Sequence, residues 1–334
     1  MKLHALVIAV AAAGLVPASA QAPQAGQAPA PATAVAPAPT PVPAPAPGVV
    51  ADPTPGASAV APASEPAAAA PAFQHKAPEP GIGMPRPGAL GTQAQFTPIG
   101  REGAAFHNNW LLLLCAAISV FVLALMVYAI IRYRRSANPV PSRTSHNTFI
   151  EVVWTLVPVL ILVAIAVPSI RLIRHQYSPP PADLTVKVIG HQWYWSYQYP
   201  DHGGFEIISN MLREKGEVAA GARYRTDADG PRLLAVDERL VIPAGQVVKF
   251  IVTSNDVIHS FAVPAFWTKI DANPGILNET WVKVDRPGVY FGQCSELCGA
   301  RHAYMPIAVE VVTPQGFAQW VASKGGTMPG ATPA

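Results

Sequence analysis

Charged side chains are scarce in this sequence, and their signs nearly cancel. Lys and Arg total 23 and Asp and Glu total 20, so charged residues make up 13% of the 334-residue chain. Soluble domains usually carry about 25%. A formal net charge of +3 is too small and too balanced for a generic nucleic-acid-binding protein, so we expect no nucleic-acid partner.

Cysteine is scarce as well. Of the three cysteines, Cys115 lies in an apolar run, and Cys294 and Cys298 share one loop, which is not the pattern of a disulfide framework. We interpret Cys115 as a small apolar filler of a helix and not as a redox group. The sequence also lacks a haem-attachment C-x-x-C-H motif. We therefore expect the chain alone to carry no oxygen chemistry.

Apolar residues and proline are abundant by contrast. Half of the residues are hydrophobic and 37 are proline, a combination that indicates a mosaic of segments. Residues 1–20 read as a secretory signal peptide, with Lys2, a short apolar run and the small-residue site Ala18-Ser19-Ala20. The alternative is an uncleaved anchor. No cysteine follows the cleavage site, which argues against lipoprotein processing.

Proline and alanine dominate residues 21–98. Proline removes backbone donors, and the segment has almost no large apolar side chains to bury. We predict an extended, disordered tether over this range, and we assign it no chemistry.

Two long apolar runs follow. Residues 110–131 have no charge and no proline, and residues 152–170 contain two prolines. At about 1.5 Å per residue each run approaches the roughly 30 Å of a bilayer core. The connection between them carries four arginines and no acid, which by the positive-inside rule places it in the cytoplasm. We predict a two-helix anchor over residues 99–175 in the inner (plasma) membrane, with the N-terminus and the following domain periplasmic.

Short β-prone runs fill residues 183–312, separated by turn signals and without long helical patterns. They predict an antiparallel sandwich or barrel. Residues 208–236 carry no strong pattern, and we expect a surface excursion there. Residues 315–323 favour a short helix within a C-terminal tail, residues 315–334.

One loop concentrates metal-binding side chains. Cys294 and Cys298 are four residues apart, His302 follows after four more, and Met305 after another three. A fifth candidate, His259, follows a predicted strand and a polar break, so we place it in a loop at a strand end. Thiolate, imidazole and thioether groups suit copper or zinc, not calcium or magnesium.

Three interpretations of this loop compete. A disulfide between Cys294 and Cys298 would leave His259, His302 and Met305 unexplained. A zinc site with two Cys and two His would not need Met305. Copper accounts for most of the side chains, although a mononuclear blue-copper site needs only one thiol. Two thiolates can bridge two copper ions, each with one His and one weak ligand, which would account for both cysteines.

Residues 293–306, QCSELCGARHAYMP, resemble the binuclear copper (CuA) loop of cytochrome c oxidase subunit II, and residues 190–197, GHQWYWSY, resemble a second motif of that family. The resemblance extends over about residues 105–315. It implies a membrane-anchored all-β fold, in which a helical hairpin of two transmembrane helices precedes a cupredoxin-like Greek-key β-barrel or sandwich at residues 176–314.

The resemblance also implies the roles of the site residues. Cys294 and Cys298 would bridge two copper ions, and His259 and His302 would bind one ion each. Met305 would be a weak ligand of one ion and the backbone carbonyl of Glu296 a weak ligand of the other. In the family the carboxylate at the position of Glu296 contributes to a magnesium site shared with subunit I.

Four further positions gain roles from the resemblance. Trp193 would be the entry point for electrons from cytochrome c, although alternating aromatics on a strand usually serve packing. The family uses acids around this patch to attract the basic cytochrome, and Asp256 and Asp201 are the candidates here. Gln198 stands where many relatives have Glu, which implies a weaker acidic patch or one placed elsewhere. Glu151 either lies at the mouth of a proton path or is simply a favourable acid at a helix start.

The family function would be that of an electron-input subunit. Such a subunit accepts electrons from cytochrome c and passes them to the haem-bearing catalytic subunit, which reduces oxygen to water with proton translocation. Its partners would be subunit I, other oxidase subunits, cytochrome c and the membrane. The rival classes are a quinol oxidase subunit without copper, a copper-delivery protein and a reductase of nitrogen oxides.

Overall fold

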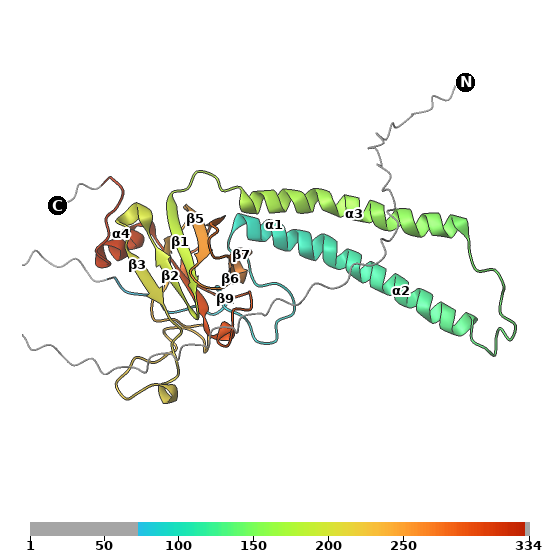
Figure 1. The fold of residues 1–334 in the computed structure, drawn as a ribbon, viewed down its shortest axis with the longest axis horizontal. Coiled ribbons are helices and arrows are strands. Elements are labelled where there is room, and N and C mark those ends of the chain that lie inside the picture. Colours follow the sequence, from blue (N-terminus) through green and yellow to red (C-terminus); the bar gives the residue numbers. More distant parts are fainter. Residues whose placement is uncertain (1–72, 331–334) are drawn as a thin grey trace, which may run out of the picture. The chain divides into compact units, whose positions relative to one another are not determined.

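The computed structural model describes residues 73–330 (Figure 1). The signal peptide predicted at residues 1–20 and the tether as far as residue 72 lie outside the described residues, as do residues 331–334. Within the described residues, two long apolar helices precede a β-sandwich and a short C-terminal helix.

The first apolar helix consists of three consecutive segments: α1 (Pro98–Phe106), a π-helical turn (His107–Leu111) and α2 (Leu112–Arg132). Figure 1 draws α1 and α2 as one continuous rod. Thr97 caps it, since its side chain accepts a hydrogen bond from Gly100 N, and Pro98 occupies the first turn, where its missing N–H is not needed. No side chain of α2 is buried. This helix has the surface of a segment that faces lipid or another subunit.

The second apolar helix, α3 (Thr148–Tyr177), continues through Pro158 and Pro168. Asn147 caps it by accepting a hydrogen bond from Ile150 N. The helix runs past the predicted apolar span of residues 152–170, because hydropathy marks only the hydrocarbon-spanning part and not the polar turns beyond it. Both apolar helices are long and apolar enough to cross a membrane.

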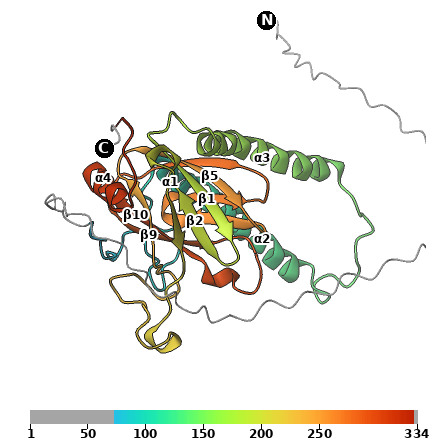
Figure 2. The same cartoon turned by 60° about the vertical axis from the view of Figure 1, so that its left-hand side comes forward.

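Ten strands form the sandwich (Figure 2). They are β1 (Leu184–His191), β2 (Tyr194–Gln198), β3 (Glu206–Ser209), β4 (Leu240–Pro243), β5 (Val247–Ser254), β6 (His259–Val263), β7 (Thr268–Ala272), β8 (Asn278–Lys283), β9 (Gly288–Cys294) and β10 (Pro306–Val312). The two five-stranded sheets have the orders β3-β2-β1-β5-β8 and β4-β10-β9-β6-β7. Helix α4 (Pro314–Ser323) follows the last strand.

Two strand pairs differ from the antiparallel arrangement predicted from the sequence. Strand β1 pairs with β5 in parallel, and β10 pairs with β4 in parallel. After β3 the chain crosses to β4 in the second sheet and returns to β5 beside β1. A connection of this kind brings two strands together in the same direction, as in a Greek-key sandwich. Local alternation of side chains does not reveal such a crossover.

The core lies between the two sheets. Aromatic and aliphatic side chains from both inner faces fill it, and the largest that are fully buried include Trp195, Tyr197, Phe250 and Phe261. Every residue of β10 is buried, on its outer face as well as its inner one. Another part of the chain must therefore cover the outside of this sheet.

That cover is a segment we call the strap, residues 73–97. The Pro- and Ala-rich composition predicts a disordered tether over these residues, and the structure differs: Ile82 is buried in the core cluster, and Phe73 and Phe96 pack against it. Phe291 N in β9 donates to the Gly83 carbonyl at 2.9 Å. The prediction failed here because it weighed the Pro-rich composition of the whole segment, whereas a few apolar anchors suffice to hold a strap on a sheet.

A buried ion pair fastens the beginning of the strap. Glu310 on β10 has a fully buried side chain and accepts a hydrogen bond from Arg239 at 3.1 Å. The same carboxylate accepts hydrogen bonds from His75 Nδ1 at 2.6 Å and from Lys76 N at 2.7 Å. Arg239 in turn donates to the carbonyls of Lys76 and Asp229. One buried pair therefore connects the strap, the second sheet and the loop that precedes β4.

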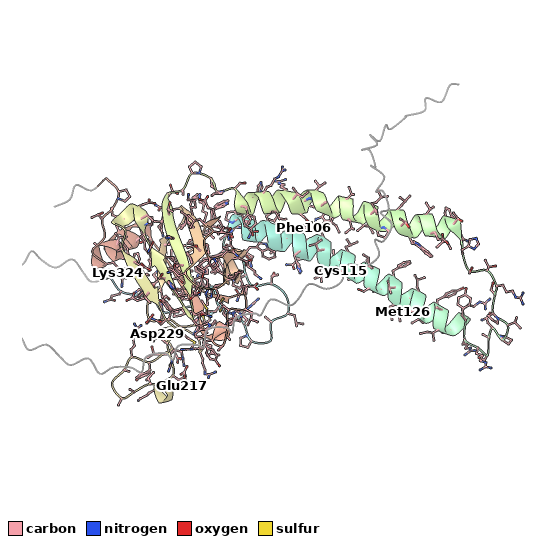
Figure 3. The ribbon with its side chains drawn as sticks, viewed as in Figure 1. Phe106, Cys115, Met126, Glu217, Asp229 and Lys324 are labelled. Carbon is pink, nitrogen blue, oxygen red and sulfur yellow. The ribbon has the colours of Figure 1, made fainter. Side chains whose placement is uncertain are left out.

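That loop is the surface excursion expected over residues 208–236. Its base is closed by a β-bridge between Met211 and Val236, and inside it Arg225 forms two hydrogen bonds with Glu214 at 2.6 and 3.2 Å. Figure 3 labels Glu217 and Asp229 along it. The excursion is held by ion pairs, which its hydropathy pattern does not indicate.

Candidate metal centre

The candidate donor side chains come from two strand ends and one loop. Cys294 is the last residue of β9, and His259 is the first residue of β6. The two strands pair with Phe261 opposite Cys294, and this register brings His259 beside the thiol. The loop from β9 to β10 then supplies Cys298, His302 and Met305.

The donor atoms face one another across short distances. The sulfur atoms of Cys294 and Cys298 are 3.9 Å apart. Nδ1 of His259 lies 3.9 Å from Cys294 Sγ, and Nδ1 of His302 lies 3.6 Å from Cys298 Sγ. The Met305 sulfur lies 3.5 Å from Cys298 Sγ. All five side chains predicted as ligands are brought together.

These distances discriminate among the interpretations of the loop. Both cysteines are free thiols, and a disulfide would need its sulfur atoms at about 2.05 Å. A zinc site would use two thiolates and two imidazoles and leave the thioether idle. Met305 is nevertheless 99% buried with its sulfur against a thiol. A soft donor set of sulfur and imidazole fits copper.

A carboxylate orients the buried histidine. Asp256 Oδ1 lies 2.8 Å from His259 Nε2, so the other ring nitrogen, Nδ1, is left free toward Cys294. A hydrogen bond of this kind from a histidine to a carboxylate is the usual support of a metal-binding imidazole. Gly190 on β1 makes room for the ring, because a Cβ there would lie 2.8 Å from His259 Cδ2.

Asp256, which the sequence predicts as a docking acid, also makes contacts within the site. Its carboxylate also accepts a hydrogen bond from Gln192 N at 2.6 Å. Burial alone would raise the pKa of Asp256, but the hydrogen bonds from His259, Val257 and Gln192 outweigh it and lower the pKa. The carboxylate is thus ionised and engaged in the site. Sequence reasoning missed this role because the order of residues along a loop does not tell which way a side chain turns.

The two thiols differ in acidity. Burial tends to raise the pKa of Cys294, but hydrogen bonds with His259 and with backbone groups outweigh it and bring the pKa to about 7. The pKa of Cys298 is raised to about 12, by burial and then by the negative charge of Cys294 beside it. Two adjacent thiolates repel each other, so a cation between them would allow both to lose their protons.

Trp193 touches the loop directly. Its indole N–H donates to the Cys298 carbonyl at 3.2 Å, and its ring lies over Gly299, where a Cβ would be 3.1 Å from Cζ2. Gln192 donates to the same carbonyl at 2.9 Å. Trp195, two residues on, is fully buried and donates to the Met305 carbonyl at 3.2 Å. Two tryptophans, one in the turn before β2 and one in β2, therefore brace the loop at two of its donor residues.

The remaining predicted residues lie in different surroundings. The carbonyl of Glu296 is 3.4 Å from Cys294 Sγ, while its side chain is exposed. Glu151 lies in the first turn of α3, where its side chain accepts a hydrogen bond from Asn147 N. Asp201 accepts one from Thr185 N. Gln198 donates to Glu206 on the neighbouring strand, so a carboxylate lies beside it.

Comparisons with known proteins agree with this geometry. The family model described as the periplasmic domain of cytochrome c oxidase subunit II matches residues 184–312, and the model of its transmembrane domain matches residues 85–172. The probable cytochrome c oxidase subunit 2 of Rickettsia bellii is 50% identical over 240 residues, which cover 72% of this chain and 86% of that protein.

Two further relatives are similar in the same way. Cytochrome c oxidase subunit 2 of Cereibacter sphaeroides is 42% identical over 259 residues, covering 74% of this chain and 84% of the relative. The crystal structure of the periplasmic domain of subunit II of the Bradyrhizobium japonicum cytochrome oxidase is 51% identical, covers 44% of this chain and 96% of its own, and gives a TM-score of 0.38. The chain belongs to the cytochrome c oxidase subunit II family, as a membrane-anchored, copper-binding component of that oxidoreductase.

Proposed function

We propose that the chain is the electron-input subunit of a cytochrome c oxidase. It accepts electrons one at a time from cytochrome c at a binuclear copper centre. The electrons then pass to haem in the catalytic subunit I, which reduces oxygen to water with proton translocation. The observation that carries this proposal is the arrangement of two facing thiols, each with its own imidazole and its own weak donor.

The donors divide evenly between the two sulfur atoms. Cys294 has His259 and the Glu296 carbonyl beside it, and Cys298 has His302 and Met305. When two copper ions are bound, they would share one unpaired electron through the bridging thiolates. A mononuclear site would have no use for the second thiol, so this division supports two ions.

Packing and hydrogen bonds hold most of the donors in place. His259 is fully buried, Met305 nearly so, and both thiols are enclosed by the core. Asp256 holds one imidazole, and Trp193 and Trp195 hold the loop backbone. Donors held by packing keep nearly the same geometry in both oxidation states of the metal. This lowers the reorganisation energy of each electron transfer.

The entry point we propose is the face formed by Trp193. Its ring is partly exposed at the surface, and its indole N–H donates to the Cys298 carbonyl. It therefore spans the distance from the surface to residues 294–305, which we call the donor loop. The exit lies at Glu296, whose carboxylate is exposed while its carbonyl faces Cys294. We assign that carboxylate to a magnesium ion shared with subunit I.

The membrane topology follows from charge. Arginines crowd the connection between the two helices, residues 133–147, and acids are absent from it, which supports a cytoplasmic connection. The sandwich and the N-terminus then lie in the periplasm of a bacterium. Residues 1–20 would be the signal peptide that directs export, and residues 21–72 the tether that follows it. Glu151 lies in the first turn of α3. In this topology that turn would be at the cytoplasmic side, and Glu151 would stand at the mouth of a proton path in subunit I.

A copper-delivery protein is the second candidate class, and the burial of the donors disfavours it. Delivery requires ligands that exchange with a partner, whereas His259, Cys294, Cys298 and Met305 are all buried. A quinol oxidase subunit would lack the copper ligands altogether. Both alternatives would leave the contact between Trp193 and the donor loop without a purpose.

Metal content tests the proposal most directly. We expect two copper ions per chain in the purified oxidase, and an electron spin resonance signal whose hyperfine structure reports one electron shared by two copper nuclei. A single copper ion, or zinc, would refute the binuclear site.

The entry point has its own test. Trp193→Phe should slow reduction of the copper centre by cytochrome c without changing the copper content, because the indole N–H to Cys298 and part of the ring are lost. Tyr304→Phe, a change at an exposed aromatic within the loop between β9 and β10, is the matched control. Unchanged turnover in the Trp193 variant would mean that electrons enter elsewhere.

A further inference from the structure

The backbone takes an unusual conformation where β6 ends. A short 3-10 turn, Pro264–Phe266, follows the strand, and Trp267 comes next with φ at 59°. This left-handed region suits glycine and is disfavoured for a bulky L-residue. A tryptophan in this strained conformation points to a function of its ring.

The Trp267 ring lies against Gly103 of α1. A Cβ at residue 103 would be 2.5 Å from Cε2 and 2.6 Å from Nε1 of the indole. Real Cβ atoms do not approach other atoms so closely, and the obstacle is a rigid ring and not the end of a flexible side chain. Only glycine therefore fits at residue 103 without a shift of the helix.

Both membrane helices are attached around the same tryptophan. From α3, Gln176 Nε2 donates to the Trp267 carbonyl at 3.1 Å. At the start of α1, Thr97 Oγ1 donates to the carbonyl of Phe266 at 2.9 Å. Trp281 on β8 donates to the His175 carbonyl near the end of α3 at 2.8 Å. We call the set Gly103, Gln176, Trp267 and Trp281 the joint.

The joint is connected to the metal donors by a single strand. β6 has five residues, with His259 at one end and the turn to Trp267 at the other. Phe261, midway along it, pairs with Cys294 of β9. Because β6 is hydrogen-bonded to β7 and β9, a displacement of Trp267 relative to the helices carries these two donor residues along as one rigid unit, without changing how they face each other.

We infer that Gly103 and Trp267 are positioning residues, which fix the height and tilt of the donor loop relative to the membrane helices. The inference rests on the proposed function, in which the electron leaves the donor loop for haem held by a membrane partner. The joint thus sets the distance of the outgoing transfer. The joint does not affect the transfer of electrons from cytochrome c to the donor loop, because Trp193 contacts that loop without involving any residue of the joint.

The test uses the assembled oxidase with Gly103→Ala. An electron is injected photochemically into the copper centre, and the haem absorbance is followed in time. We expect the outgoing transfer to slow by roughly three- to tenfold, since small misplacements of reacting groups have large effects on rate. Copper content, the electron spin resonance signal, and the KM for cytochrome c should stay unchanged. Gly216→Ala is the control, because a Cβ there meets no atom within 4 Å.

A second variant protects the test against failed assembly. Trp267→Gly removes the ring and leaves a residue at ease with a φ of 59°. It should slow the outgoing transfer as well, and Gly103→Ala added to it should cause no further slowing, because the two residues act through one contact. An outgoing rate equal to the control in both single variants would overturn the inference. Absence of photoreducible copper in the unmodified enzyme would instead refute the proposed function.

Discussion

The sandwich and the two membrane helices are stabilised in different ways. Large side chains such as Trp195, Phe250 and Tyr290 are fully buried in the sandwich, whereas no side chain of α2 or α3 is buried. Figure 3 shows side chains crowded between the sheets but standing free along α2 around Cys115 and Met126. The sandwich therefore carries its own tertiary packing, and the helices depend on backbone hydrogen bonds in an apolar surrounding.

This difference separates two properties of the copper site. The arrangement of its donors is a property of the sandwich core and needs no partner. In the proposed function its location relative to haem depends on the anchor, which contacts the sandwich at the joint. Substitutions in the two regions should consequently have different consequences.

The largest contrast comes from one substitution made in both regions. Cys298→Ser should abolish copper binding, because it removes a soft donor that faces both His302 and Met305. Cys115→Ser should leave copper content intact, since that side chain is exposed on α2 and its neighbours are apolar. Copper per chain measured in both purified variants checks the pair. Loss of copper in the Cys115 variant would contradict the idea that the site is independent of the helices.

Next in size is the effect of a buried charge. Glu310→Ala should lower the free energy of unfolding by about 3–5 kcal/mol, because Arg239 would remain buried without its partner. The matched change in the anchor is Arg171→Gln, which breaks an exposed pair with Glu102 at 3.7 Å and should cost less than about 1 kcal/mol. Thermal unfolding of both variants gives the comparison. Equal losses would show that the strap is not held by the buried pair.

A smaller effect is expected beside the site. Gly190→Ala would place a Cβ 2.8 Å from the His259 ring and should cost about 1–3 kcal/mol by overpacking. The copper spectrum should shift with it, because the ring is a ligand in the proposed site. Gly216→Ala, in open space, should change neither stability nor spectrum. A normal spectrum in the Gly190 variant would mean that the histidine can move without effect.

The smallest effect concerns pH. Burial alone would raise the pKa of Glu310, but hydrogen bonds from His75 and Lys76 and the charge of Arg239 hold it below its usual value. A carboxyl with a lowered folded-state pKa adds stability above its unfolded pKa of about 4.3, and that stability is lost as pH falls through the folded pKa. Unfolding midpoints measured between about pH 7 and about pH 3 should fall less steeply in Glu310→Gln than in the unmodified chain. Identical slopes would remove Glu310 from the acid response.

The sequence predicts the parts of the molecule that depend on local pattern. Long apolar runs indicate the two helices, and soft donors at short offsets indicate the donor loop, because neither needs knowledge of distant contacts. That the five side chains bind metal stays a prediction. The strap and the parallel pairs β1–β5 and β4–β10 could not be predicted, since both arise from contacts between residues far apart in the chain. Asp256 was noticed for its charge, but its contact with His259 depends on how the loop folds back.

The hydrogen bonds of Asp256 have a consequence for protein engineering. One carboxylate holds the His259 imidazole and the backbone of Gln192, the residue before Trp193. Residues 293–306 grafted onto another β-sandwich would lack this acid, the cleared space at Gly190 and the indole that braces Cys298. A transplant intended both to load with metal and to exchange electrons would need three separate stretches of chain, around residues 190–195, 254–261 and 293–306.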